Sequence, residues 1–212
     1  MIKIQRFVFN SFQVNCYILS VESGDAVIID AACFFPYEEQ KLKLFVETLN
    51  LKPVRLLNTH GHFDHLMGNN FVEETWGLKS EIHKEDNYLV EQASALSLMF
   101  GMSMPKPPLP GSFFEDGDIL TFGNSSLKVI FVPGHSPGSV AFYSEADKLL
   151  IAGDIIFNGS VGRTDLPKGN HEQLITGIKE KLLILDPATK VYCGHGPETT
   201  IGAEKSYNQF LN

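Results

Sequence analysis

The first part of the chain alternates between short apolar runs and polar turns. Residues 2–9, 15–21 and 26–30 are rich in β-branched and aromatic side chains, and Ser23-Gly24-Asp25 lies between the last two runs. Such runs favour strands, and a glycine beside aspartate favours a tight turn. The pattern therefore predicts a β-meander that opens the fold.

Later segments carry apolar residues at helical spacing. In residues 37–50 and again in residues 171–185 they recur three and four positions apart, and we place a further helix near residues 201–210. This period puts apolar side chains on one face of an α-helix. We therefore expect amphipathic helices here, with a strand over residues 54–57 after the first of them.

Two stretches of the chain resemble each other. Residues 15–30 and residues 139–154 each contain a β-rich run, a polar turn and a second apolar run that closes on an aspartate, Asp30 or Asp154. Matching halves of this kind predict two β-sheet units, each followed by helices, that pack sheet against sheet with the helices outside. The predicted fold class is α/β, a four-layer αββα sandwich, formed by a single domain over residues 1–212.

A segment without strand signals interrupts this plan at residues 84–110. Its apolar spacing predicts a helix over residues 84–100, and a Met-rich stretch and the proline-rich loop 105–110 follow. Two interpretations stay open. The segment is either a packed helix with a stiff connector or a hydrophobic cap, in which adaptable Met and Phe side chains wall a ligand pocket.

Composition narrows the class of protein. The chain has 212 residues, of which 43% are hydrophobic and 20% charged, which suits one globular domain with a sizeable core. The formal net charge of −8 leaves no broad basic surface for a nucleic-acid backbone. We therefore expect a small-molecule substrate and no nucleic-acid partner, and the composition leaves the oligomeric state open.

Cysteine usage and the N-terminal residues bear on location. Cys16, Cys33 and Cys193 are widely spaced and odd in number, which fits reduced, buried thiols better than a disulfide framework. Polar residues interrupt the N-terminal segment, unlike the core of a signal peptide, and no run approaches the roughly 18 apolar residues of a membrane span. We expect a cytoplasmic protein with no membrane partner.

The densest group of potential metal ligands lies soon after the predicted strand at residues 54–57. It is the hexapeptide His60-Gly61-His62-Phe63-Asp64-His65. On an extended backbone the side chains of His60 and His62 fall on one face and can bind one ion together. If a helix starts at Asp64, the side chains of Asp64 and His65 diverge from that pair and can reach a second ion.

Three further segments end an apolar run in a ligand-type residue beside a glycine. They are Gly134-His135, Gly153-Asp154 and Gly194-His195. Strand ends that meet at one rim of two packed sheets would bring these side chains to the hexapeptide, and glycine relieves crowding where backbone passes close to an ion. The joint pattern predicts a two-metal site built from His60, His62, Asp64, His65, His135, Asp154 and His195.

A structural role is the alternative for each of these residues. Taken alone, His135 or His195 would be interpreted as a hydrogen-bonded core or surface histidine, but unrelated histidines have no reason to collect at the ends of apolar runs. His83 and His171 lack this context and are interpreted as structural. Asp30 is expected only as a hydrogen-bond partner of a ligand.

The hexapeptide and the three glycine-linked ligands, in this order and spacing from Asp30 to His195, resemble the metallo-β-lactamase superfamily. The resemblance implies the αββα sandwich. It also implies two ligand groups and a bridge: the first ion on His60, His62 and His135, the second on Asp64, His65 and His195, and Asp154 between them.

The ligand types point to hydrolytic chemistry. Imidazole and carboxylate suit zinc and also iron or manganese, so the expected cofactors are two divalent ions, with zinc preferred. Zinc lowers the pKa of a bound water to about 7, and a second ion can polarise the carbonyl under attack. We expect a metal-bound hydroxide as the nucleophile in place of a serine, with Asp64 or Asp154 relaying a proton.

The stretch after Asp154 bears on the substrate. Its Gly162-Arg163-Thr164-Asp165 element is similar to one in glyoxalase II-like hydrolases and persulfide dioxygenases. Arg163 is predicted to hold a substrate carboxylate through its bidentate fork, with Asp165 orienting it and Lys168 adding positive charge. The alternative is an Arg163–Asp165 pair that braces the loop. The favoured function is a short glyoxalase II-like hydrolase that cleaves a thioester, in the manner of a hydroxyacylglutathione hydrolase, or another ester.

Two features set the chain apart from full-length glyoxalase II enzymes. Only 17 residues follow His195, where those enzymes carry a helical extension that contacts glutathione, and residues 84–110 lengthen the interval between His65 and His135. These differences predict a specificity of the chain's own. The alternative from another class is a mononuclear iron persulfide dioxygenase-like oxidoreductase, whose members carry Cys-Gly-Arg where this chain has Val161-Gly162-Arg163.

Overall fold

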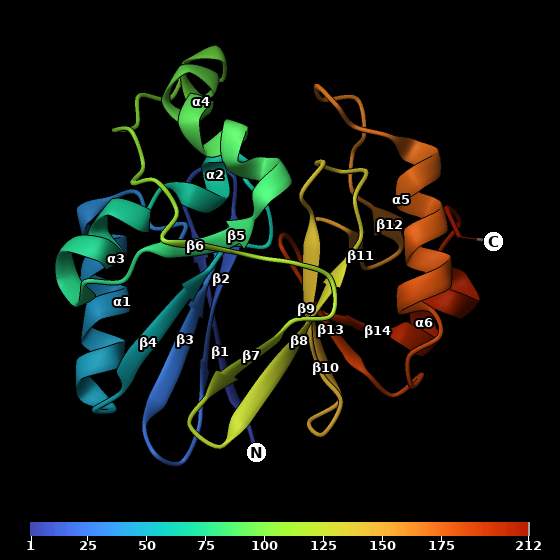
Figure 1. Ribbon diagram of the computed structural model, residues 1–212, viewed down its shortest axis with the longest axis horizontal. Helices are drawn as coiled ribbons and strands as arrows, with labels where there is room; N and C mark the ends of the chain where they lie inside the picture. The colour runs from blue at the N-terminus through green and yellow to red at the C-terminus, as the bar shows by residue number, and fades with distance from the viewer. Residues whose placement is uncertain (212) are drawn as a thin grey trace.

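Two six-stranded sheets face each other in the computed structural model, which describes residues 1–211 (Figure 1). The first sheet has the order β1-β2-β3-β4-β5-β6. Its strands are β1 (Lys3–Phe9), β2 (Val14–Ser20), β3 (Asp25–Ile29), β4 (Lys52–Leu57), β5 (Ser80–His83) and β6 (Ser112–Phe114).

The second sheet has the order β14-β13-β10-β9-β8-β7. It consists of β7 (Ile119–Phe122), β8 (Ser125–Phe131), β9 (Val140–Ser144), β10 (Leu149–Gly153), β13 (Lys190–Cys193) and β14 (Thr199–Thr200). A separate short hairpin pairs β11 (Ile156–Phe157) with β12 (Ser160–Val161).

Helices cover the outer face of each sheet (Figure 1). The first sheet carries α1 (Pro36–Thr48) and α3 (Asn69–Trp76), and the second carries α5 (His171–Gly177) and α6 (Ile201–Tyr207). Two more helices, α2 (Phe63–Leu66) and α4 (Asn87–Met99), lie at one rim of the sandwich, and a 3-10 turn (Lys84–Asp86) leads into α4. The four layers confirm the predicted αββα sandwich.

The strand sequences explain why the layers form. Every residue of β2 is buried, because neighbouring side chains point to opposite faces and both faces are covered. Cys16 and Ile18 pack with the α1 residue Leu42 in the outer core, whereas Tyr17 and Leu19 pack in the core between the sheets. The continuous apolar runs of the sequence therefore become strands buried on both sides.

The internal repeat is confirmed as two equivalent βαβ units. In the first, β2 and β3 form an antiparallel hairpin and the chain returns through α1 to β4, which runs parallel to β3. In the second, β9 and β10 form the hairpin and the chain returns through α5 to β13, parallel to β10. Asp30 follows β3 directly and Asp154 follows β10 directly, so both lie at the carboxyl ends of parallel strands, where α/β folds place their binding sites.

The helix predicted over residues 171–185 differs most from the structure, whereas those predicted over residues 84–100 and 201–210 are shorter than expected, at Asn87–Met99 and Ile201–Tyr207. The α-helix ends at Gly177, and a π-helical turn (Ile178–Leu182) continues the chain. The wider turn lets both Leu182 and Leu183 be buried against the second sheet. Within residues 1–211, no helix has the length and apolar character needed to cross a membrane.

Candidate metal centre

The predicted metal ligands gather at the rim where the two sheets meet. His60 and His62 follow β4, His135 follows β8, and Asp154 and His195 follow β10 and β13. Asp64 and His65 lie on α2, which begins at Phe63 with His62 still in an extended conformation. The chain thus turns into a helix where the sequence pattern required it, and the two halves of the hexapeptide point to different neighbours.

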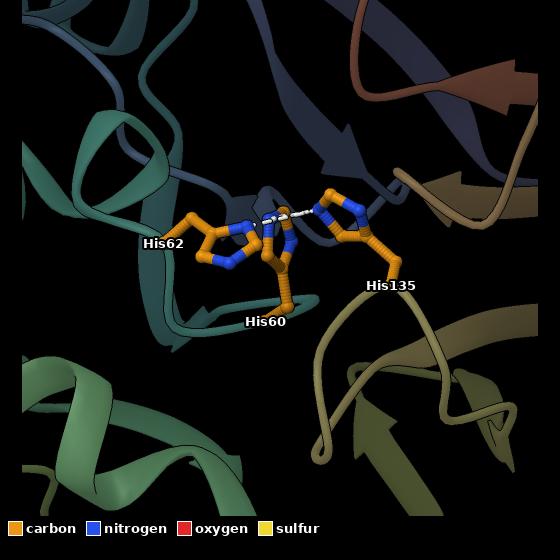
Figure 2. A group of neighbouring side chains, drawn as sticks. All are labelled: His60, His62 and His135. Atoms are coloured by element: carbon orange, nitrogen blue, oxygen red, sulfur yellow. Dashed lines mark hydrogen bonds between the residues drawn. The ribbon is translucent and has the colours of Figure 1, made fainter. Parts of the chain in front are cut away.

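His60, His62 and His135 form the first ligand group, and Figure 2 shows their rings turned toward one another. His62 Nδ1 lies 2.9 Å from His135 Nε2, and His60 Nε2 lies 3.3 Å from the same atom. Two nitrogens that share a tetrahedral zinc at about 2.0–2.1 Å are themselves about 3.3–3.4 Å apart. The 3.3 Å separation matches this value, and the 2.9 Å separation is shorter, so a shared ion requires His62 and His135 to move slightly apart.

Asp64, His65 and His195 form the second ligand group. His65 Nε2 lies 3.4 Å from His195 Nε2, and Asp64 Oδ2 lies 3.8 Å and 3.6 Å from these two nitrogens. His65 is fully buried, whereas the side chains of Asp64 and His195 are 15% and 28% exposed. The second group therefore lies closer to solvent, which leaves an approach for a substrate.

Asp154 lies between the two groups. Its Oδ2 is 3.6 Å from His135 Nε2 of the first group and 3.4 Å from His195 Nε2 of the second, and its Oδ1 is 3.5 Å from His65 Nε2. Oδ1 is buried and has no hydrogen-bond partner among the described residues. A buried carboxylate oxygen without a donor is costly, and a cation at this position would satisfy it. The donor set therefore fits a pair of divalent ions.

The outward nitrogens of four histidines are held by the protein. Nδ1 of His60 contacts Thr59 Oγ1 at 3.0 Å, and Nδ1 of His65 contacts Asp30 Oδ2 at 3.0 Å. Nδ1 of His135 and of His195 lie 2.8 Å and 2.9 Å from the backbone oxygens of Arg163 and Phe12. A proton on Nδ1 leaves the inward Nε2 as a lone pair, which is the arrangement that metal-binding histidines require.

Asp30 connects both ligand groups. Its Oδ2 accepts a 2.7 Å hydrogen bond from Thr59 Oγ1 in addition to its contact with His65, and its Oδ1 accepts from the Thr59 backbone N–H at 2.8 Å. Thr59 in turn contacts His60. The hydrogen-bond role expected for Asp30 is observed, and it extends to the first group through Thr59.

The charges of the two groups differ. Burial and the neighbouring imidazoles hold the pKa of His60 well below its usual range and lower the pKa of His62 to about 3. Burial also opposes the charged form of His65, but Asp154, Asp64 and Asp30 outweigh it and raise its pKa well above the usual range. For His60 and His62 the neutral imidazole is therefore favoured, as metal binding requires.

The lowered pKa of His62 predicts a pH dependence of the metal-free protein. Between about pH 6.5 and 3 the unfolded chain binds a proton that folded His62 does not, so the free energy of unfolding falls as the pH drops. We expect metal-free His62→Gln protein to lose less stability than the unsubstituted protein between about pH 6.5 and 4.5 in urea unfolding. An equal loss in the two proteins would contradict this assignment.

The predicted substrate residues lie at the edge of this centre. Arg163 makes a bidentate pair with Asp165, with both N–O distances 2.7 Å, and both side chains are exposed. Lys168 places Nζ 3.7 Å from the ring centre of Tyr88 in α4. The pair that braces the loop is thus present in the structure, and substrate binding by Arg163, Asp165 and Lys168 stays a prediction.

The two remaining histidines lie outside the ligand groups. His83 stacks on Phe131 with ring centres 4.2 Å apart, and His171 is exposed at the start of α5, so neither joins a ligand group.

The loop around His135 also contains a serine motif. Gly134-His135-Ser136-Pro137-Gly138 matches the Gly-x-Ser-x-Gly pattern of serine hydrolases, a match that the sequence interpretation missed. Ser136 is buried and donates to Asp86 Oδ2 at 2.6 Å, so its hydroxyl has a structural partner in place of a catalytic base.

The remaining sequence expectations concern the cysteines. Cys16, Cys33 and Cys193 are free and buried. Burial raises the pKa of Cys193 to about 12 and raises the pKa values of the other two thiols as well. None of the three is a metal ligand or a reactive nucleophile, which agrees with the interpretation of small buried residues.

The fold and the ligand pattern define the class of protein. Residues 10–195 match the family described as Metallo-beta-lactamase superfamily, and the chain belongs to this superfamily. Its members bind divalent metals and are typically metal-dependent hydrolases. The resemblance inferred from the hexapeptide is therefore confirmed at the level of family and fold.

Two proteins are similar to this chain over nearly its whole length. The chain is 37% identical over 212 residues to the Probable metallo-hydrolase YqgX of Bacillus subtilis, and the match covers 99% of this chain and 98% of the relative. It is 36% identical over 208 residues to the Hydroxyacylglutathione hydrolase GloC of Haemophilus influenzae, covering 95% and 94% of the two chains.

Solved structures of similar proteins have the same fold. BLEG-1 B3 metallo-beta-lactamase superposes with a TM-score of 0.91 at 32% identity, covering 99% of this chain and all of the other. TTHA1623, whose structure is of a di-iron-bound form, superposes with a TM-score of 0.88 at 39% identity, covering 98% and 100%. These similarities extend over the whole sandwich and include a protein with two metal ions.

Proposed function

We propose that the chain is a binuclear metal-dependent hydrolase that cleaves a small thioester. The observation that carries the proposal is the position of Asp154, whose two carboxylate oxygens contact histidines of both ligand groups while Oδ1 has no hydrogen-bond donor among the described residues. The second complete group, Asp64, His65 and His195, supports a binuclear centre over a mononuclear one that would use the first group.

The residues of the chain supply orientation and proton transfer. When bound, divalent ions lower the pKa of a water molecule and polarise a carbonyl group. The outward hydrogen bonds of the histidines fix their rings, so the centre needs little rearrangement during the reaction. We propose that Asp64 or Asp154 accepts the proton of the attacking water and returns it to the departing sulfur when the carbon–sulfur bond breaks, since both carboxylates belong to the candidate ligand groups.

The relatives support a thioester as the substrate. The Haemophilus influenzae relative bears the name hydroxyacylglutathione hydrolase, and the alignment covers 94% of its length. A relative of similar length therefore carries that name, which supports a glutathione thioester as the candidate substrate. Zinc is the proposed metal because the imidazole and carboxylate set suits it, and the di-iron form of TTHA1623 makes iron the alternative to measure.

Arg163 is proposed to bind a carboxylate of the substrate. Its guanidinium is exposed, and its backbone oxygen contacts His135 of the first ligand group. We expect Arg163→Ala to raise KM about tenfold for a thioester that bears a carboxylate, with little change in kcat, because a charged hydrogen bond contributes about 1.5–3 kcal/mol and solvent weakens this one.

Steady-state kinetics on a carboxylated thioester and on a matched uncharged one would check the Arg163 prediction. Arg55→Ala is the control, because Arg55 makes a similar bidentate pair with Glu81 away from the ligand groups. An equal KM change for both substrates would argue that Arg163 only braces its loop.

Metal analysis joined to a substrate screen tests the function. The purified protein would be assayed for zinc, iron and manganese, and then for cleavage of thioesters, lactones, phosphoesters and β-lactams and for oxygen uptake with glutathione persulfide. Two equivalents of metal with thioester cleavage that a chelator abolishes would support the proposal. One equivalent of iron with oxygen uptake would replace it with the persulfide dioxygenase alternative.

A further inference from the structure

Asp86 is a fully buried carboxylate between the two loops that carry the first ligand group. It ends the 3-10 turn that leads into α4, at the start of the segment over residues 84–110. Its Oδ2 accepts hydrogen bonds from the backbone N–H of Gly61 at 2.8 Å and from Ser136 Oγ at 2.6 Å. Its Oδ1 accepts from the backbone N–H of Gly138 at 2.6 Å.

These donors come from opposite halves of the sandwich. Gly61 lies between His60 and His62 in the loop after β4 of the first sheet, whereas Ser136 and Gly138 follow His135 in the loop after β8 of the second sheet. One carboxylate therefore joins the two loops whose histidines face each other in Figure 2.

Packing around Asp86 leaves the loops little freedom. A Cβ added at Gly61 would lie 2.9 Å from the Asp86 backbone oxygen, and one added at Gly138 would lie 2.6 Å from Asp86 Cγ. Ser136 is fixed further by Ser139, whose Oγ accepts from the Ser136 backbone N–H at 3.0 Å. Both loops thus approach the carboxylate as closely as glycine allows, so a change at Asp86 is transmitted to both.

We propose that Asp86 is a positioning residue that sets the separation between His60 and His62 on one loop and His135 on the other, and so holds the first metal position preformed. The inference rests on the proposed function only in that these three histidines bind a metal ion. It gives the segment over residues 84–110 a part in building the centre, whether or not the rest of the segment covers a substrate.

The isosteric change Asp86→Asn is the informative variant. A carboxylate accepts hydrogen bonds on both oxygens, but an amide accepts on its oxygen and donates from its nitrogen. In either orientation the NH₂ group of the asparagine therefore faces another donor, either the Gly138 N–H or the Gly61 N–H and Ser136 hydroxyl, and those hydrogen bonds are lost. The side-chain volume is unchanged. We expect the affinity of the first metal position to fall about 10- to 100-fold, the usual cost of losing a partner that orients ligands.

Single-position backgrounds separate this effect from a general loss of structure. In a His195→Ala protein the first ligand group remains complete, and in a His62→Ala protein the second remains complete. Zn²⁺ affinity would be measured in each background by competition with a chromophoric chelator, with and without Asp86→Asn. Glu204→Gln is the matched control, because Glu204 is buried and accepts from Gly159 and Thr199 but contacts neither loop.

The proposal expects Asp86→Asn to weaken Zn²⁺ binding in the His195→Ala background and to leave it unchanged in the His62→Ala background, with Glu204→Gln changing neither. No loss in the His195→Ala background, or an equal loss in both, would overturn it. If the Asp86→Asn protein does not fold, Ser136→Ala, which removes one of the three donors to Asp86, replaces it. This variant should likewise weaken Zn²⁺ binding in the His195→Ala background and not in the His62→Ala background. The readout needs no substrate, so a failed thioester assay would leave its outcome intact.

Discussion

Replacement of Asp154 with asparagine is expected to leave at most one tightly bound metal ion and to reduce turnover by more than about 100-fold. Loss of a hydrogen-bond partner outside the ligand set already costs about 10- to 100-fold in metal affinity or activity. Asp154 contacts histidines of both ligand groups directly, and its Oδ1 has no donor among the described residues. An amide in its place carries no charge and turns N–H donors toward imidazole nitrogens that must stay free for metal.

Elemental analysis and initial rates on the same preparation would check this result. Asp147→Asn is the control, because Asp147 accepts from the Ile2 backbone N–H and from Ser144 Oγ on the far hairpin and contacts no ligand. Two tightly held metal equivalents in the Asp154→Asn protein would show that this carboxylate does not bridge the ions.

Replacement of Gly194 with alanine is expected to disrupt the centre even more completely. A Cβ at this position would collide with Oδ1 of Asp154 and would lie 3.0 Å from Cε1 of His65. The backbone cannot move away, because Gly194 N–H donates to the Gly153 oxygen at 2.7 Å and its own oxygen accepts from Asn15 N–H at 2.7 Å. We expect a protein that binds little metal and loses about 1–3 kcal/mol or more of stability, the cost of overpacking a tight site.

The control for Gly194→Ala is a glycine whose constraint is purely conformational. Gly77 ends α3 with φ of 70° and nothing within 4 Å of an added Cβ. Gly77→Ala should lower the free energy of unfolding by a similar amount, about 1–3 kcal/mol, because the left-handed backbone conformation is strained for alanine. Thermal unfolding should show a loss of stability in both variants, whereas metal content should fall in the Gly194→Ala protein and be retained in the Gly77→Ala protein. Equal metal content in both variants would show that Gly194 is not tightly packed against Asp154.

The sequence by itself determined the layers and the identity of the ligand groups. A mostly apolar run such as β2 favours a strand covered on both faces, and the repeat that ends in Asp30 and Asp154 predicted two such sheets. Glycines beside His135, Asp154 and His195 marked places where the backbone passes close to another segment of the chain: Asn170 and Leu174 at Gly134, Thr59 at Gly153, and Asp154 at Gly194. Each of these features is visible in a short segment, and their recurrence along the chain identified the site.

Apart from Asp30, which the sequence predicted as a hydrogen-bond partner, the groups that orient those ligands were decided by the tertiary structure. The backbone oxygens of Phe12 and Arg163 that hold His195 and His135 carry no side-chain signature, because every residue has such an oxygen. Asp86 lies 25 and 50 residues from the Gly61 and Ser136 donors, a separation that no periodic pattern encodes.

The short strands β5 and β6 carried no recognisable pattern in the sequence either, and each is defined by its parallel pairing with a neighbouring strand. They have four and three residues, which is too few for a period to be recognised. Sequence periodicity reports which face of an element is apolar, but the partners that fix a ring or a loop are chosen by the packing of segments far apart in the chain.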